Sequence, residues 1–202
     1  MNKILMTIGL LLLLISCNKS TPKYTLADSE GFQQQLNDEM LDEKTTPVPP
    51  EDFENFKGLD FFPLDEEYIV QANFKRTADE ESFMMPTSKK DIQKKFVKYG
   101  EVHFKLKGKK ATLNIYKYEP KEPLKTPENE DYLFIPFTDL SNGETTYTAG
   151  RYIDMKKPES NKVIIDFNTA YNPDCVYNTY SSCPIPPEEN DLAINIEAGV
   201  KL

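Results

Sequence analysis

Apolar residues recur at every second position along much of the chain. Tyr68, Val70, Ala72 and Phe74 are the first such series, and a period of two is typical of a half-buried β-strand. Gly108 marks the tight turn of a predicted hairpin. Further strands are predicted over residues 93–99, 101–107, 111–115, 132–137, 151–155, 163–167 and 192–196. We therefore expect a mainly β protein with an antiparallel sheet, a sandwich or a partly closed barrel.

One segment ahead of these strands has the period of a helix instead. Phe32, Leu36 and Met40 fall at i, i+4 and i+8, and acidic residues occupy the other face. This pattern predicts one N-terminal amphipathic helix over about residues 28–44, ended by the proline-rich stretch at 47–50. With the β-rich region at 56–202, it is expected to form a single globular domain over residues 25–202.

The first seventeen residues have the pattern of a targeting signal. Lys3 precedes an apolar run at 4–15, which is shorter than the roughly 20 residues that a spanning helix needs. The run ends at Ser16-Cys17 in a sequence that resembles the lipobox of bacterial lipoproteins. The resemblance implies a signal peptide at 1–16, lipidation of Cys17 by fatty acids such as palmitate, and a tether at 17–24. The alternative is an ordinary secretory signal followed by an unrelated cysteine.

Lipidation of Cys17 would make the membrane the first partner of this chain, through an anchor and not a span. Asn18 stands where an aspartate would indicate retention at the inner membrane, and Lys19 and Ser20 form no acidic export signal. We therefore expect a cell-envelope protein on the outer membrane, facing the periplasm.

The charge of the chain argues against a nucleic-acid partner, because the formal net charge is −9. Residues 89–110 are nevertheless rich in lysine, with only Asp91 and Glu101 as acidic residues. Lys105 and Lys107 alternate with apolar positions, so the lysines are typical of the solvated face of strands. A patch that meets an anionic lipid or glycan is the alternative.

Two thiols remain once Cys17 is lipidated. Cys175 and Cys183 are eight positions apart, and in an oxidising periplasm this spacing favours a disulfide. Free thiols and a metal pair are the alternatives. The single histidine, His103, lies far away in a predicted strand, and tetrahedral metal sites usually need four nitrogen or sulfur ligands. We therefore expect no metal and no cofactor.

Arg151 is the first candidate for ligand binding. It follows a turn-rich loop and is flanked by Asp139 and Glu144. A guanidinium in such a loop can clamp a carboxylate or a phosphate with two hydrogen bonds. A structural ion pair between Arg151 and a neighbouring carboxylate is the alternative.

A second group of candidates follows the apolar run at 163–165. Asp166 and Asn168 could orient the hydroxyl groups of a ligand, with Tyr171 as an apolar platform, or they could cap turns. Further along, a proline-rich arm carries Glu189 and Asn190 back toward the sheet. Asp166 and Glu189 are weak candidates for an acid–base pair.

The order of several motifs resembles one known family. LFIPFTD, GETTYTAGRYID, IDFNTAYNPDCVYN, CPIPPEEN and IEAGVK are similar to the C-terminal signature of the domain of unknown function 1684, and GLDFFPLDEEYIV resembles its earlier block. The resemblance covers about residues 56–201. It implies a secreted or lipid-anchored bacterial protein and no established activity. Asp174 and Asp191 stand where the family pattern usually has a tyrosine and an arginine.

These observations favour a binding or accessory module of the cell envelope for a small anionic or polar ligand. Its site would be built from the polar candidates and Tyr171, namely Asp139, Glu144, Arg151, Asp166, Asn168, Tyr171 and Asn190. One alternative is a hydrolase of envelope or carbohydrate material that uses Asp166 and Glu189. The other is a structural interaction lipoprotein that binds through its proline-rich arm. No catalytic motif is recognisable, and no particular protein partner is indicated.

Overall fold

The structure is a computed structural model that describes residues 24–78, 80–119 and 132–202. The predicted signal peptide and the lipidation site at Cys17 lie outside these residues. The fold is mainly β, as the alternation of the sequence predicts. Its sheet is antiparallel apart from one short parallel pairing. The strands are β1 (Ile69–Arg76), β2 (Phe83–Pro86), β3 (Gln93–Leu106), β4 (Lys109–Tyr118), β5 (Tyr132–Asp139), β6 (Arg151–Lys156), β7 (Lys162–Asp166) and β8 (Asp191–Leu192).

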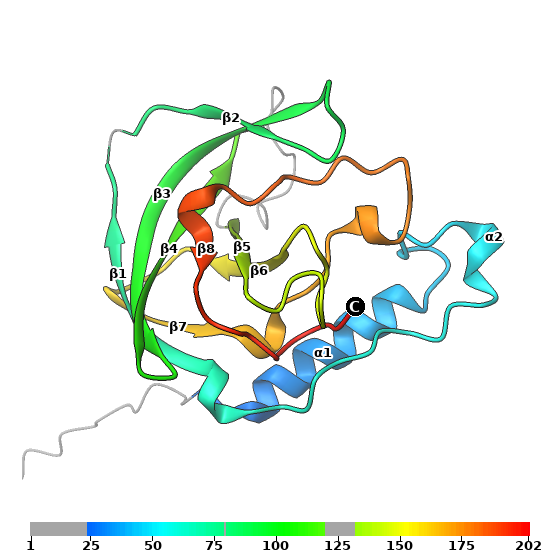
Figure 1. The fold of residues 1–202 in the computed structure, drawn as a ribbon, viewed down its shortest axis with the longest axis horizontal. Helices are drawn as coiled ribbons and strands as arrows, with labels where there is room; N and C mark the ends of the chain where they lie inside the picture. Colours follow the sequence, from blue (N-terminus) through cyan, green and yellow to red (C-terminus); the bar gives the residue numbers. More distant parts are fainter. Residues whose placement is uncertain (1–23, 79, 120–131) are drawn as a thin grey trace, which may run out of the picture.

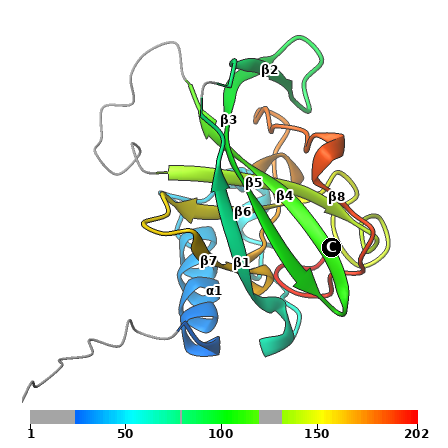
Figure 2. The ribbon, with the colours of Figure 1, turned by 90° about the vertical axis from the view of Figure 1, so that its left-hand side faces the viewer.

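The sheet curls into a half-barrel (Figure 1). Its strand order is β6-β5-β4-β3-β1-β7, while β2 pairs with β3 and β8 pairs in parallel with β5. β3 and β4 are the long strands of the hairpin predicted around Gly108, which is confirmed. Figure 2 shows the strong twist, because β5 runs across the direction of β1, β3 and β4.

A β-bulge in β3 divides this sheet into two regions. Lys98 pairs with Tyr116 of β4 but Gly100 pairs with Ile115, so one extra residue lies in β3. Successive side chains of a strand point to opposite faces, and the extra residue therefore moves the inward-facing set of β3 to the other face of β4. The strand paired with β3 also differs on the two sides of the bulge. Residues 93–96 of β3 pair with β2, and residues 100–103 pair with β1.

Each region of the sheet has its own hydrophobic cluster. The larger is the main core, which includes Leu113, Ile135 and Ile165. The smaller, which we call the aromatic cluster, consists of Met85, Phe96, Tyr116, Phe134, Tyr152 and Cys183. Adjacent residues of β5 belong to different clusters, with Ile135 in the main core and Phe134 in the aromatic cluster. β5 is therefore buried on both faces, which explains its unbroken apolar run.

The N-terminal helix α1 (Leu26–Met40) lies along one side of the sheet (Figure 1). A capping box between Thr25 and Asp28 begins it. Ser29 and Met40 are buried, whereas Phe32 is half-buried. The predicted amphipathic helix is thus confirmed, although it ends at Met40, before the predicted end at residue 44. A short helix, α2 (Pro50–Phe53), follows the proline-rich stretch.

Irregular chain covers the aromatic cluster. It contains the 3₁₀ turns η3 (Phe167–Thr169), η4 (Asp174–Val176) and η5 (Glu188–Asn190), whereas η1 (Glu66–Tyr68) precedes β1. Isolated bridges join Tyr171 to Tyr152 of β6 and Pro184 to Thr87 beside β2. The segment between η3 and η5 is therefore fixed to the sheet at both ends of the cluster.

The strand predicted over residues 192–196 is wrong for most of its length. β8 ends at Leu192, and Ile194 and Ile196 are buried in irregular chain. The alternation there reflects burial against the main core and not strand pairing. The sequence also failed to indicate β2, a short strand that pairs only with β3.

Candidate functional site

Arg151 lies at the start of β6 in a buried ion pair. Its guanidinium and the carboxylate of Asp139 are both fully buried, and Nη2 lies 3.0 Å from Oδ2. Nη2 also donates to the carbonyl of Ile196 at 2.8 Å, and Nη1 donates to the carbonyls of Ala198 and Val200. The structure thus has the structural ion pair and not a ligand clamp. The guanidinium holds the C-terminal segment against the ends of β5 and β6.

Asp166 and Asn168 join the helix and the η1 turn to the end of β7. Oδ2 of Asp166 accepts hydrogen bonds from Tyr24 Oη at 2.9 Å and from Ser29 Oγ at 2.6 Å. Its Oδ1 accepts from the backbone and side-chain nitrogens of Asn168 at 2.9 and 2.8 Å. Asn168 also exchanges two hydrogen bonds with the backbone of Asp65, each 3.0 Å long. Both side chains are therefore occupied by protein groups.

The side chain of Asn190 lies between β4 and β5 and forms hydrogen bonds with both strands. β4 and β5 are paired only at Tyr116 and Phe134. Beyond that point the Asn190 side chain accepts from the backbone N–H of Asn114 at 2.7 Å and donates to the carbonyls of Asn114 and Pro136 at 2.9 and 2.7 Å. These bonds satisfy backbone groups that would otherwise be buried without partners.

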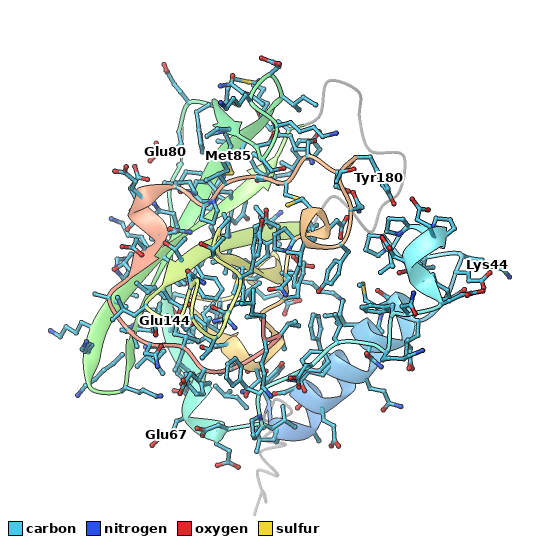
Figure 3. All side chains as sticks on the ribbon, turned by 45° about the vertical axis from the view of Figure 1, so that its right-hand side comes forward. Lys44, Glu67, Glu80, Met85, Glu144 and Tyr180 are labelled. Carbon is cyan, nitrogen blue, oxygen red and sulfur yellow. The ribbon has the colours of Figure 1, made fainter. Side chains whose placement is uncertain are left out.

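The two remaining acidic candidates are exposed and lie apart from this network. Glu144 is on the β5–β6 connection (Figure 3), and Glu189 is in η5 near Tyr116. Asp166 is instead covered by α1, and Figures 1 and 2 place α1 and β8, which follows η5, on different sides of the molecule. Within the part of the chain that the structure describes, no contact joins Asp166 to Glu189.

The two cysteines are neighbours but are free thiols. The predicted disulfide is therefore not found. The backbone N–H of Cys175, in η4, donates to Sγ of Cys183 at 3.0 Å, so this sulfur faces the backbone of its neighbour. Desolvation by burial raises the pKa of the Cys183 thiol to about 12, which keeps it protonated at neutral pH.

Of the predicted ligand-binding residues, Tyr171 alone lines the cavity over the aromatic cluster. This cavity has a volume of about 290 Å³. Six of its lining residues are aromatic and come from four strands and the irregular chain: Phe96, Tyr118, Tyr132, Phe134, Tyr152 and Tyr171. We call it the aromatic cavity.

The rings of the aromatic cavity are steeply inclined to one another. Phe134 and Tyr152 lie edge to face, with ring centroids 4.6 Å apart and planes at 68°. The planes of Tyr152 and Tyr171 meet at 84°, and those of Phe96 and Tyr118 at 48°. Only Phe96 and Phe134 approach a parallel stack, at 24°. The rings therefore form walls in several directions.

Two phenols of the cavity share one carboxylate. Tyr132 Oη and Tyr171 Oη each donate to Oδ1 of Asp154 at 2.7 Å. Desolvation by burial, and then the charge of Asp154, raises the pKa of both phenols, so they remain donors. Desolvation also raises the pKa of Asp154 itself, and the two phenols oppose this effect. The Asp154 residue itself is exposed.

Besides the phenols and the Cys183 thiol, the polar side chains in the cavity lining are Lys94, Asp174, Ser181 and Ser182. Lys94 lies two positions before Phe96 on β3, and Asp174 begins η4. Desolvation raises the pKa of Asp174, and the charge of Lys94 opposes this shift. An ammonium and a carboxylate thus stand near each other at an otherwise aromatic cavity.

Over residues 24–78, 80–119 and 132–202, no three or more His, Cys, Asp or Glu residues are grouped to hold a metal ion. The helices in these ranges are also too short or too polar to cross a membrane.

A family model described as "Protein of unknown function (DUF1684)" matches residues 54–201. The chain belongs to the DUF1684 family. It is also similar to an uncharacterized protein of Haloarcula marismortui whose structure was solved by solution NMR. The two are 29% identical, the TM-score is 0.65, and the match covers 88% of this chain and 98% of the other. No curated protein matches the chain.

Both departures from the family pattern can be located in this DUF1684 protein. Asp174, where a tyrosine is usual, lines the aromatic cavity. Asp191, where an arginine is usual, accepts a hydrogen bond from Thr138 Oγ1 at 2.8 Å on the parallel pairing of β8 with β5. At the first of these positions, this chain places a carboxylate in the cavity lining.

Sequence reasoning missed most of the cavity of this DUF1684 protein. Phe96, Phe134 and Tyr152 were expected only as strand residues, and Tyr118 lay outside every predicted strand, although it is the last residue of β4. A signal was nevertheless present, because the apolar run of β5 has no polar face, and a strand without a polar face needs cover on both sides. The bulge in β3, which turns Phe96 toward that second face, has no comparable sequence signal.

Proposed function

We propose that this chain is a binding module for a small ligand that occupies the aromatic cavity. The observation that supports this most directly is six aromatic side chains around a cavity of about 290 Å³, with a few polar groups beside them. Ligand pockets are typically apolar and aromatic, with a small number of polar groups that orient the ligand. The volume is at the low end for such pockets and suits a small molecule.

The polar part of the ligand would meet Lys94, Asp174 and the two serines. Lys94 takes the role that the sequence suggested for Arg151, because the guanidinium of Arg151 has no exposed surface. The ligand is therefore still expected to carry an anionic or polar group, but that group would meet Lys94 and not Arg151. Asp166 and Asn168 have structural roles in it.

A hydrolase based on Asp166 and Glu189 has no support in this geometry. Asp166 accepts four hydrogen bonds from protein groups, and Glu189 lies in another part of the fold. General acid–base catalysis requires both groups within hydrogen-bond reach of one substrate.

We further propose that the module is anchored in the cell envelope through lipid on Cys17, on the outer membrane and facing the periplasm. The apolar run at 4–15 and its lipobox-like end support this anchor. In cells grown with labelled palmitate, the wild-type chain should carry label and sediment with membranes. Cys17→Ser should do neither. An unlabelled wild-type chain would refute the anchor.

Ligand binding can be tested by calorimetric titration of the full-length protein in nanodiscs of phosphatidylethanolamine and phosphatidylglycerol. The probes are neutral and acidic monosaccharides, amino acids, short peptides, choline and phosphocholine. We expect at least one to bind with a Kd below about 1 mM. Tyr118→Ala should weaken that binding at least about tenfold, because it removes one wall of the cavity.

Tyr99→Ala is the matched control. Tyr99 is also a half-buried β-strand tyrosine, but it stacks on Phe74 outside the cavity, so its removal should leave the Kd unchanged. Absence of binding by every probe, or equal affinity of wild type and Tyr118→Ala, would contradict the proposed function.

A further inference from the structure

The inclination of the rings limits the shape of the ligand. A flat sugar or base is normally held on one ring or between parallel rings. Here the plane of Tyr152 is inclined by 68° to that of Phe134 and by 84° to that of Tyr171. Rings that are steeply inclined to one another suit a compact, nearly spherical group that touches several walls at once.

The electrostatics of the cavity favour a positive charge on that group. The face of an aromatic ring carries negative potential, which attracts cations within about 6 Å of its centre. Tyr132 and Tyr171 donate their hydroxyl protons to the same oxygen of Asp154. A phenol polarised by a carboxylate has a more electron-rich ring, and the charge of Asp154 adds to the attraction.

Asp174 adds a second carboxylate, this time in the lining itself, whereas Lys94 is the one cation among the lining residues that the structure describes. A ligand with a positive charge alone would be attracted by the carboxylates but repelled by Lys94. A ligand that also carries an acidic group would satisfy Lys94 as well. The positive charge of such a ligand would face the carboxylates of Asp154 and Asp174, and its negative charge would face Lys94.

From this geometry we propose that the aromatic cavity binds a zwitterionic methylated ammonium compound. The methylated ammonium is surrounded by Tyr118, Tyr132, Phe134, Tyr152 and Tyr171, and the acidic group of the ligand pairs with Lys94. This inference rests on the proposed function, because it assigns a ligand class to the same cavity. Aromatic cages elsewhere hold methylated ammonium groups by the same attraction.

Three probes with the same branched head group, a nitrogen or carbon atom bearing three methyl groups, separate the contributions. Phosphocholine has both charges, choline has only the ammonium, and 3,3-dimethyl-1-butanol is the neutral isostere of choline. In calorimetric titrations of the full-length protein in nanodiscs free of choline lipids, phosphocholine should bind most tightly. Choline should bind on the order of tenfold more tightly than its neutral isostere.

Substitutions assign these differences to residues. Lys94→Gln should weaken phosphocholine binding about tenfold and leave choline binding equal or tighter. Lys95→Gln is the control, because Lys95 is the next residue on β3 but pairs with Glu119 outside the cavity. Tyr118→Leu should weaken choline binding but not that of the neutral isostere, while Tyr118→Phe should retain both. Circular dichroism establishes that each variant is folded.

The outcomes distinguish the two proposals. Equal affinity for choline and 3,3-dimethyl-1-butanol would refute the cationic ligand while leaving a binding cavity. Binding of a sugar or peptide in place of all three probes, with sensitivity to Tyr118→Ala, would also refute the ligand class alone. If no probe of either panel binds, both proposals fail.

Discussion

At the scale of single residues, the buried polar side chains act as partners for irregular backbone. Arg151 binds carbonyls of the C-terminal segment, and Asn190 binds backbone groups between β4 and β5. Irregular chain lacks the regular hydrogen bonds of helices and sheets, so its buried backbone groups need side-chain partners. From the sequence, both residues were candidates for ligand binding. Whether such a polar side chain can bind a ligand or instead supports the fold depends on how deeply it is buried. A single sequence does not show that burial.

Replacement of Arg151 tests this structural role. Arg151→Met leaves the Asp139 carboxylate buried without its cation, so the free energy of unfolding should fall by about 3–5 kcal/mol. Urea denaturation measures the change. Arg76→Met is the control, since Arg76 is exposed and its loss should cost about 1 kcal/mol or less. Equal small losses would show that the buried ion pair contributes little.

Cys183 gives a second prediction at this scale. Because its pKa is raised to about 12, little thiolate is present at pH 8 and iodoacetamide should alkylate Cys183 slowly in the native protein. Burial in the folded protein favours the protonated thiol over the thiolate. The stability that comes from this protonated form is therefore lost as pH rises from the ordinary cysteine pKa toward the raised value. Peptide mass mapping follows the labelling. Both Cys175 and Cys183 should react quickly after denaturation, and failure of either to do so would indicate a disulfide.

At the scale of elements, strands were the easiest features to predict and their exact pairing the hardest. The hairpin at Gly108 and the helix followed directly from periodicity. The bulge in β3 did not, because it depends on the close approach of β1. A Cβ at position 100 would lie 2.5 Å from Cε2 of Phe74 and 2.7 Å from the carbonyl oxygen of Lys75. The aromatic cluster escaped prediction for the same reason, since the bulge determines which face Phe96 occupies.

Gly100→Ala should therefore destabilise the protein by about 1–3 kcal/mol, because the backbone of β1 would have to move. Gly31→Ala provides a control of opposite sign. Apart from its chain neighbours and the backbone of α1 itself, no atom lies within 4 Å of a Cβ placed at Gly31, so alanine there should stabilise the protein by about 0.5–1 kcal/mol. Thermal unfolding of the two variants measures both effects. A neutral Gly100→Ala would mean that β1 adapts without cost.

At the scale of the whole molecule, polar contacts at the end of β7 help to attach α1 to the sheet. Ser29 is fully buried in the helix and donates to Asp166, and Gln33 Nε2 donates to the carbonyl of Asn168 at 2.8 Å. The helix stripe contains few large apolar residues, so these hydrogen bonds matter for its position.

Ser29→Ala removes one of the four donors to Asp166 and should lower the free energy of unfolding by about 1–3 kcal/mol. Glu30→Ala, a change at the exposed neighbouring position, should stay within about 0.5 kcal/mol of wild type. Hydrogen exchange of α1 amides should accelerate in Ser29→Ala and remain unchanged in Glu30→Ala. Unchanged protection in both variants would show that α1 is held by its apolar contacts alone.

The hydrogen bond between Tyr24 and Asp166 also has a consequence for where the protein can work. If Cys17 is held in a membrane, only the stretch from Cys17 to Tyr24 separates the acyl chains from a residue fixed to the folded domain. Fully extended, those seven steps span at most about 25 Å. Tyr24 would then stay within that distance of the lipid surface. The aromatic cavity would bind molecules that are released at the membrane surface or delivered to it.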